Sequence, residues 1–213
     1  MKKVISLIIV LFISVSSLSL TMTAAKETGD FVCGIWKYSV YPDHVTITGV
    51  TTPVSGKIEI HAELDGHKID YVTINDFKKN DQITEAVIGE GIEYIASSIF
   101  TGCKNLKKVT LPSTLESISC DAFLNCISLT DINIPDSLIY VEPDLFSGCT
   151  ALKEIKLPET WSEVNMRLFK GCTSLETITI PSKVRSIASS AFEGCTSLKN
   201  VYLSDGLKEI KRE

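Results

Sequence analysis

Cysteine is the residue type in this 213-residue chain with the clearest capacity for chemistry, and five of the seven cysteines recur at a fixed interval. These five are 23 residues apart: Cys103, Cys126, Cys149, Cys172 and Cys195. A zinc site needs ligands that converge tetrahedrally, whereas one cysteine per repeat forms a row. Parallel side chains one repeat apart also hold their Cβ atoms farther apart than the roughly 3.5–4.5 Å of a disulfide. We therefore predict a row of buried, reduced thiols that fill a turn and bind no metal.

The remaining cysteines and the histidines form no catalytic or metal-binding pattern. Cys33 and Cys120 lie outside the row, and the odd total leaves at least one cysteine unpaired or bonded to another molecule. A disulfide at Cys33 stays an open alternative, without an assignable partner. His44, His61 and His67 lack metal-like spacing, and the chain has no nucleophile elbow, phosphate-binding glycine loop, H-E-x-x-H or EF-hand motif. We predict no enzyme activity, no metal and no cofactor.

A repeat of 23 residues positions the cysteine row. A phenylalanine stands three residues before each regular cysteine, and one more phenylalanine precedes the series by the same interval. The six phenylalanines are Phe77, Phe100, Phe123, Phe146, Phe169 and Phe192. Most copies continue with the pattern L-x-x-I-x-L, which is followed in four of them by proline. The register holds over six copies without an insertion, which is the signature of a repeat solenoid.

Each copy is predicted to contain two short strands joined by turns. The L-x-x-I-x-L segment alternates at its end, which is typical of a half-buried strand, and the proline ends it by removing a main-chain donor. A second extended piece, such as residues 115–118, is expected on the opposite side of the coil. The F-x-G-C segment predicts a tight turn, where glycine permits a backbone geometry that other residues resist. One copy cannot bury its apolar residues alone, so stacked copies with parallel strands must bury them together.

The residues ahead of the repeats are predicted to cap the solenoid. Two alternating segments, 35–41 and 44–50, flank a Pro-Asp turn and predict a β-hairpin that covers the first repeat with Trp36. Residues 57–60 resemble a degenerate first strand, and a longer loop follows at 61–68. The predicted organisation is a signal peptide at 1–25, a hairpin cap at 26–57 and a solenoid of six phenylalanine-centred repeats at 58–213.

The first 25 residues have the three parts of a secretory leader. Lys2 and Lys3 precede an apolar run at 4–13, and the small residues at 23–25 suit signal peptidase. The run is too short to span a bilayer, and no later segment approaches 18 consecutive apolar residues. Loss of two lysines changes the formal charge from −5 to −7, and an acidic chain without a basic run argues against nucleic-acid binding. We expect a secreted or cell-surface protein with neither a lipid anchor at the leader nor a hydrophobic anchor at the C-terminus.

The block A-F-L-N-C-I-S-L-T-D-I-N-I-P at 122–135, with its copies, resembles the BspA-like leucine-rich repeat family. The period lies within the roughly 20–29 residues of leucine-rich repeats, and the resemblance covers about residues 58–213. It implies a β-rich leucine-rich repeat solenoid with a parallel sheet on one face. It also implies a secreted or surface-displayed protein without enzymatic activity, since some members act as adhesins that bind host or neighbouring-cell proteins.

The side chains that flank the inward residue of each predicted first strand are the candidate binding residues. They vary from copy to copy, whereas their inward neighbours stay aliphatic. We name them the ladder: Lys108, Thr110, Asp131, Asn133, Glu154, Lys156, Thr177, Thr179, Asn200 and Tyr202. Only Tyr202 is aromatic, so the ladder lacks the cluster of aromatic or arginine anchors of a strong hot spot. A sheet face kept polar for solubility is the alternative interpretation.

These observations favour a non-catalytic protein that recognises a protein at the cell exterior through the ladder. Two alternatives stay open. One is a structural module, or a fragment of a larger surface array, with no ligand of its own. The other is a glycan binder, which needs exposed aromatic rings to stack on sugars, and the ladder offers few.

Overall fold

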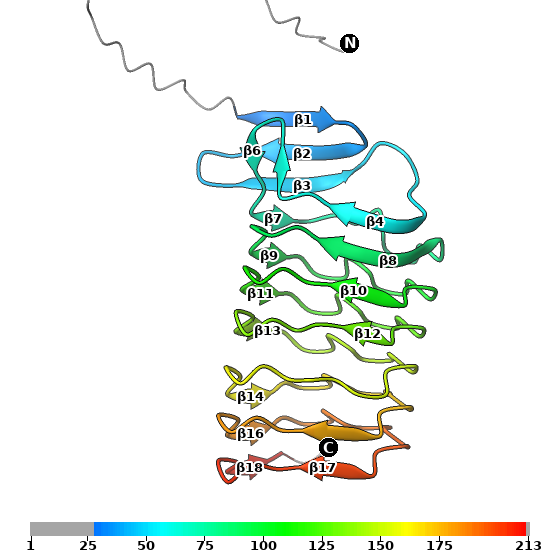
Figure 1. Cartoon of the computed structure of the whole chain (residues 1–213), viewed down its shortest axis with the longest axis vertical. Coiled ribbons are helices and arrows are strands. Elements are labelled where there is room, and N and C mark those ends of the chain that lie inside the picture. Colours follow the sequence, from blue (N-terminus) through cyan, green and yellow to red (C-terminus); the bar gives the residue numbers. More distant parts are fainter. Residues whose placement is uncertain (1–27, 212–213) are drawn as a thin grey trace, which may run out of the picture.

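In the computed structural model, which describes residues 28–211, each 23-residue repeat forms one coil of a β-solenoid. We number coils 1 to 6 by their phenylalanines, so that coil 1 begins at Phe77 and coil 6 at Phe192. The coils stack into an elongated body with two columns of short strands (Figure 1). Within the described residues all regular elements are strands. The predicted leader lies outside the described residues.

Except in coil 4, the first strand of each coil comes from the L-x-x-I-x-L segment. The first-strand column contains β4 (Gly56–Ile60), β8 (Ile83–Ile88), β10 (Lys108–Thr110), β12 (Asp131–Ile132), β15 (Thr177–Thr179) and β17 (Asn200–Tyr202). Neighbours pair in parallel one repeat apart, so Val109 lies opposite Ala86 on one side and Ile132 on the other. The pairing of β4 with β8 confirms the predicted degenerate strand. This register turns one apolar residue per coil inward and stacks these residues into a continuous core.

A second strand follows in each coil on the other side of the core. The second-strand column contains β7 (Tyr71–Val72), β9 (Tyr94–Ile95), β11 (Ser117–Ile118), β13 (Tyr140–Val141), β14 (Glu163–Val164), β16 (Ser186–Ile187) and β18 (Glu209–Ile210). These strands are two residues long, and they also pair in parallel. The second extended piece that the repeat pattern predicts is therefore present in every coil.

Three antiparallel strands cover the N-terminal end of the stack. β2 (Trp36–Val40) and β3 (Val45–Val50) form the predicted hairpin, and β1 (Gly29–Cys33) adds an outer strand that was not predicted. β3 pairs in parallel with β7, so the cap continues the second-strand column. Trp36 is buried and meets the Phe77 ring edge-on at 6.4 Å between centroids. The loop at 61–68 contains a small hairpin of β5 (Glu63–Leu64) and β6 (His67–Lys68).

The six phenylalanines form an unbroken stack along one side of the core, which we call the spine. Consecutive ring centroids are 5.6–5.8 Å apart, and the ring planes lie within 12° of parallel. Each regular cysteine donates its thiol proton to the carbonyl oxygen of the phenylalanine in the preceding coil, as Cys149 does to Phe123 at 3.2 Å. The thiols are free and, apart from half-buried Cys195, fully buried. This confirms the predicted thiol row and adds a hydrogen bond that was not predicted.

The turn after each phenylalanine requires a left-handed backbone residue. Gly102, Gly148, Gly171 and Gly194 supply it with φ between 71° and 76°. In the other two described turns of this kind the position is taken by Lys79 and Asn125, with φ of 60° and 58°. The glycine of the F-x-G-C segment therefore has the role that its sequence position predicts.

The strand pairing stops between coils 3 and 4, although the repeat register does not. β12 and β13 are the last strands of their sheets, and new sheets begin with β15 and β14. Residues 154–156, the expected first strand of coil 4, are not a strand. The ribbons of the two coils are also visibly farther apart than elsewhere (Figure 1). The repeat pattern predicted a continuous column, so the structure corrects that expectation at this junction.

Trp161 is the sequence feature that distinguishes this junction. In the other described coils its position holds Ile, Leu or Val. The buried indole lies against coil 3 and donates its Nε1 proton to the carbonyl oxygen of Leu138 at 2.7 Å. The side-chain amide of Asn165 donates to the carbonyl oxygen of Val141 in the same way. Asn165 thus takes a main-chain acceptor that a main-chain N–H uses in the other coils, as the Ser119 N–H uses the carbonyl oxygen of Ile95. The bulk of the indole separates the coils.

Candidate binding site

The first-strand column bears an open groove of about 520 Å³ beside the interrupted junction. Five ladder residues from three successive coils line it: Asp131, Glu154, Lys156, Thr177 and Thr179. The repeat places these residues one coil apart, and the missing strand at 154–156 hollows the surface between them. Half of the ladder therefore converges on one concavity, which the sequence pattern alone did not indicate.

The floor of the groove is aliphatic and its rim is charged. Ile132, Ile155 and Ile178 contribute the floor, while Glu154 and Lys156 are exposed at the rim. Within residues 28–211 neither of these two charged side chains forms an ion pair. An apolar floor with unpaired charges around it is the usual composition of a protein-binding patch.

The other ladder residues have more local roles. Lys108 forms an ion pair with Asp131 at 2.8 Å, and the hydrogen bond to this carboxylate raises the pKa of Lys108. Asn133 is exposed, but its side-chain amide is bound to the main-chain N–H and C=O of Leu111 at 2.8 and 2.9 Å. This amide therefore secures the sheet where β12 ends and is less available to a ligand. Thr110 is half-buried.

The last two ladder residues lie on the terminal coil. Asn200 and Tyr202 stand opposite Thr177 and Thr179 in the pairing of β15 with β17. Tyr202 is exposed, and it lies one coil beyond the groove residue Thr179. The structure thus joins five ladder residues in the groove and leaves the rest above or below it.

A second candidate surface, not predicted from the sequence, lies on the second-strand column. Tyr71 and Tyr94 stack with ring centroids 4.5 Å apart, and the His44 ring meets Tyr71 at 4.8 Å. Tyr140 occupies the same column two strands below Tyr94, with Ser117 between them, and is 65% exposed. Burial and the charge of Glu116 raise the pKa of Tyr94. The signal was present in the sequence, since tyrosine recurs at 71, 94 and 140 in steps of the repeat.

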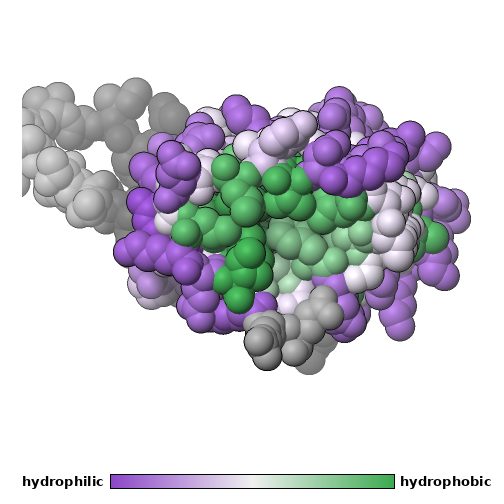
Figure 2. All heavy atoms as spheres, turned by 90° about the horizontal axis from the view of Figure 1, so that it is seen from below, coloured by the Kyte–Doolittle hydropathy of each residue, from purple (hydrophilic) through white to green (hydrophobic). Residues whose placement is uncertain are grey.

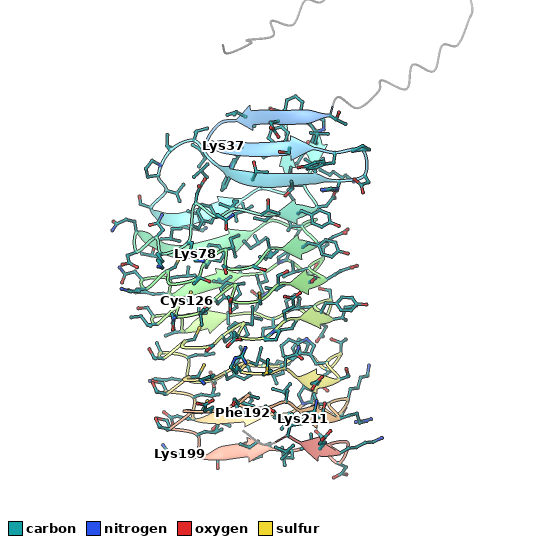
Figure 3. All side chains as sticks on the ribbon, turned by 180° about the vertical axis from the view of Figure 1, so that it is seen from behind. Lys37, Lys78, Cys126, Phe192, Lys199 and Lys211 are labelled. Atoms are coloured by element: carbon teal, nitrogen blue, oxygen red, sulfur yellow. The ribbon has the colours of Figure 1, made fainter. Side chains whose placement is uncertain are left out.

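The C-terminal end of the stack exposes apolar side chains. Figure 2 shows this end as an apolar area with a polar border. Val201, Leu203 and Ile210 on coil 6 are 42–62% exposed. Lys199 and Lys211 lie on either side of this end (Figure 3), within 3.5 Å of Glu176 and Glu163 of the coils above.

The remaining reactive side chains are placed as packing elements. Cys33 and Cys120 are free thiols and half-buried. His44 stacks on Tyr41, and His67 lies beside Phe31. In the described part of the chain, no group of three or more His, Cys, Asp or Glu side chains could hold a metal ion. Among the same residues, no helix is long and apolar enough to cross a membrane.

Comparison with known proteins matches the repeat. A family model of the BspA-type leucine-rich repeat region, in six copies, matches residues 70–173 and 116–213, which is more than half of the chain. Among curated proteins no sequence matches the chain significantly. Repeat proteins of this family and fold are typically non-catalytic.

Solved structures share the fold. A leucine-rich repeat protein of T. pallidum superposes with a TM-score of 0.75 at 25% identity, over 83% of each chain. A leucine-rich cell-surface protein of Faecalibacterium prausnitzii gives 0.71 at 25% identity, over 85% of this chain and 56% of that one. A leucine-rich repeat protein of Bacteroides ovatus gives 0.64 at 23% identity, over 84% and 54% respectively. The chain therefore spans little more than half the length of the last two proteins.

Proposed function

Because this chain belongs to the BspA-type leucine-rich repeat family, we propose that it is a non-catalytic protein that binds a protein partner outside the cell. The groove on the first-strand column carries the proposal, because it gathers five variable, polar side chains over an aliphatic floor. Parallel strands on both sides hold these side chains at fixed spacing, so little conformational entropy is lost on binding. The proposal places the contact on the ladder and not on the spine, which is buried.

Export is part of the same proposal. The charged start, apolar run and small-residue end of residues 1–25 are the features of a cleaved leader. A similar solved structure is a leucine-rich cell-surface protein, which agrees with display outside the cell. We propose that the mature protein is secreted or displayed at the surface, in an adhesin-like role.

Charge reversal at the groove tests the proposal. A partner would be captured on the immobilised protein from the medium of co-cultured cells, identified and purified. The Lys156→Glu variant is expected to bind it at least tenfold more weakly, because Lys156 is an unpaired cation on the groove rim. Lys153→Glu is the matched control, since Lys153 is exposed on the same coil but does not line the groove. Its affinity should stay within twofold of the wild type, and both variants should melt at the wild-type temperature.

Two results would place the contact elsewhere. If both charge reversals weaken binding equally, the effect is general electrostatics, and the groove is not the site. If neither weakens binding but substitutions in the loop at 61–68 do, the site belongs to the cap.

A glycan-binding function is the second candidate, because three tyrosine rings gather on the second-strand column, of which Tyr140 is exposed and the other two are half-buried, whereas the ladder has one ring, Tyr202. Tyr71, Tyr94 and Tyr140 lie in one line on flat parallel strands, and sugars stack on such rings through their apolar faces. A glycan array with the wild-type protein should then give binders whose signal falls at least fivefold with Tyr94→Ala. Tyr202→Ala, on the other column, is the control and should leave the signal unchanged. An array without reproducible binders contradicts this function.

A further inference from the structure

The inward apolar residues of coil 3 are less buried than expected for a coil that has a neighbour on both sides. Ile132, Ile134 and Val141 are half-buried. Their equivalents one coil earlier, Val109, Leu111 and Ile118, are at most 3% exposed. Outside coil 3, exposure of these inward columns occurs in coil 6, where the described stack ends. The apolar columns therefore behave at the junction as they do at an end, although a further coil follows.

The main chain is unpaired at the same place. In the other junctions the strands exchange bonds such as the one from the Asp131 N–H to the Lys107 carbonyl oxygen, at 3.1 Å. Between 131–132 and 154–156, and between β13 and β14, no main-chain hydrogen bond occurs in the described chain. Unpaired strand edges with free N–H and C=O groups are templates for another strand.

The junction is nevertheless held at a defined width. On its closed side the spine continues, because Phe123, Phe146 and Phe169 stack at 5.6–5.7 Å without interruption. On the second-strand column Trp161 and Asn165 bind the carbonyl oxygens of Leu138 and Val141 of coil 3 through their side chains. The opening is therefore formed before a ligand arrives, which lowers the cost of filling it.

From these three observations we infer that the junction between coils 3 and 4 is a slot that accepts an extended segment of the protein partner as an added β-strand. The inference rests on the proposed function and specifies the form of the ligand. An extended chain fits because its two edges can pair with residues 131–132 on one side and with residues 154–156 on the other. Its alternate side chains would then cover Ile132 and Ile155. A helix satisfies its own main-chain groups and would leave both edges unpaired.

Charge further restricts the segment. Asp131 and Glu154 stand at successive positions on the outward side of the slot, and Lys108 of coil 2 already pairs with Asp131. An added strand with a lysine or arginine at the corresponding outward position would lie beside Glu154. The preferred segment is therefore apolar at alternate positions, with a basic residue beside Glu154 and an acidic or uncharged polar residue beside Lys156.

A synthetic peptide with the sequence of residues 105–115 is a suitable probe, since it has this pattern. Hydrogen exchange in the whole protein is the readout. Without peptide, the amides at 154–156, which donate no main-chain hydrogen bond, should exchange at least tenfold faster than those of β10 in coil 2. Saturating peptide should slow their exchange at least tenfold. The matched control is the same peptide N-methylated at residues 108–110, which keeps the side chains but cannot pair, and it should give no protection.

Three outcomes overturn the inference. The first is free-protein exchange at the junction as slow as in coil 2, which means that the slot is closed. The second is protection confined to coil 6, the other open edge, or absent at millimolar peptide. The third is equal protection by the N-methylated peptide. If a natural partner binds in a Lys156-dependent way despite any of these outcomes, strand addition is wrong and the proposed function stands.

Discussion

Replacing Phe146 with alanine is expected to lower the free energy of unfolding by about 3–5 kcal/mol, as for other buried aromatic truncations. Phe146 is fully buried and stacks on the rings of both neighbouring coils. It lies where the two sheets are interrupted, so the spine joins coils 3 and 4 without the support of paired strands. Because repeat proteins are stabilised by contacts between neighbouring repeats, we expect the variant to unfold in two steps during a urea titration.

Phe100→Ala is the matched control for this prediction. Phe100 is equally buried and stacked, but the strands of coils 1, 2 and 3 are paired around it. This variant should lose a similar free energy yet keep a single transition. Two-step unfolding of both variants, or of neither, would show that the interruption does not weaken the junction.

Alkaline pH is expected to destabilise the protein steeply from about pH 9. Burial raises the pKa of Cys103 to about 11 and of Cys172 to about 12, and it raises those of Cys126 and Cys149 still further. In the unfolded chain a thiol ionises near pH 8.5. Stability is therefore fully present below this pH and falls as pH rises toward the folded pKa values. The loss is about 1.4 kcal/mol per pH unit for each thiol, and these four act together with Cys195, whose pKa burial raises to about 11.

Urea titrations at pH 7, 9 and 10 measure this effect. A variant with Cys126→Ala and Cys149→Ala should start from lower stability but lose only about three-fifths as much free energy per pH unit, because three of the five thiols remain. It also controls for lysine and tyrosine ionisation, which it leaves unchanged. A wild-type midpoint that stays constant to pH 10 would contradict the prediction.

The repeat itself could be predicted from the sequence because each apolar column depends on local spacing. Phenylalanine at intervals of 23 fixes one position per coil, so the parallel stack, the two strand columns and the buried thiols follow. The hairpin at 36–50 follows from alternation and its Pro-Asp turn. These features depend on repeated spacing or on local alternation, and both can be seen in a single sequence.

Other features depend on single residues or on distances in space. Trp161 is a single tryptophan at a position where the other described coils have Ile, Leu or Val. It accompanies the loss of strand pairing between coils 3 and 4 in both strand columns. The thiol-to-carbonyl bonds join residues 26 apart, which the 23-residue period does not point to. Ser117 interrupts the series of tyrosines in the second-strand column. The tyrosines are therefore recognised as one surface only when the strands are aligned in the stack.

The uninterrupted spine beside interrupted sheets gives the molecule a preferred direction of bending. Between coils 1, 2 and 3, and between coils 5 and 6, paired strands on both columns resist any tilt of one coil against the next. At the junction between coils 3 and 4 the spine and the turn hydrogen bonds beside it are continuous, whereas both strand columns are unpaired and are bridged by the side chains of Trp161 and Asn165. The three C-terminal coils can therefore tilt about the spine. Flexural stiffness is then low along one axis and high along the others. A force that pulls the two ends of the solenoid apart will therefore deform the junction between coils 3 and 4 first. The first-strand column, which carries the groove, will change its curvature before any coil unfolds.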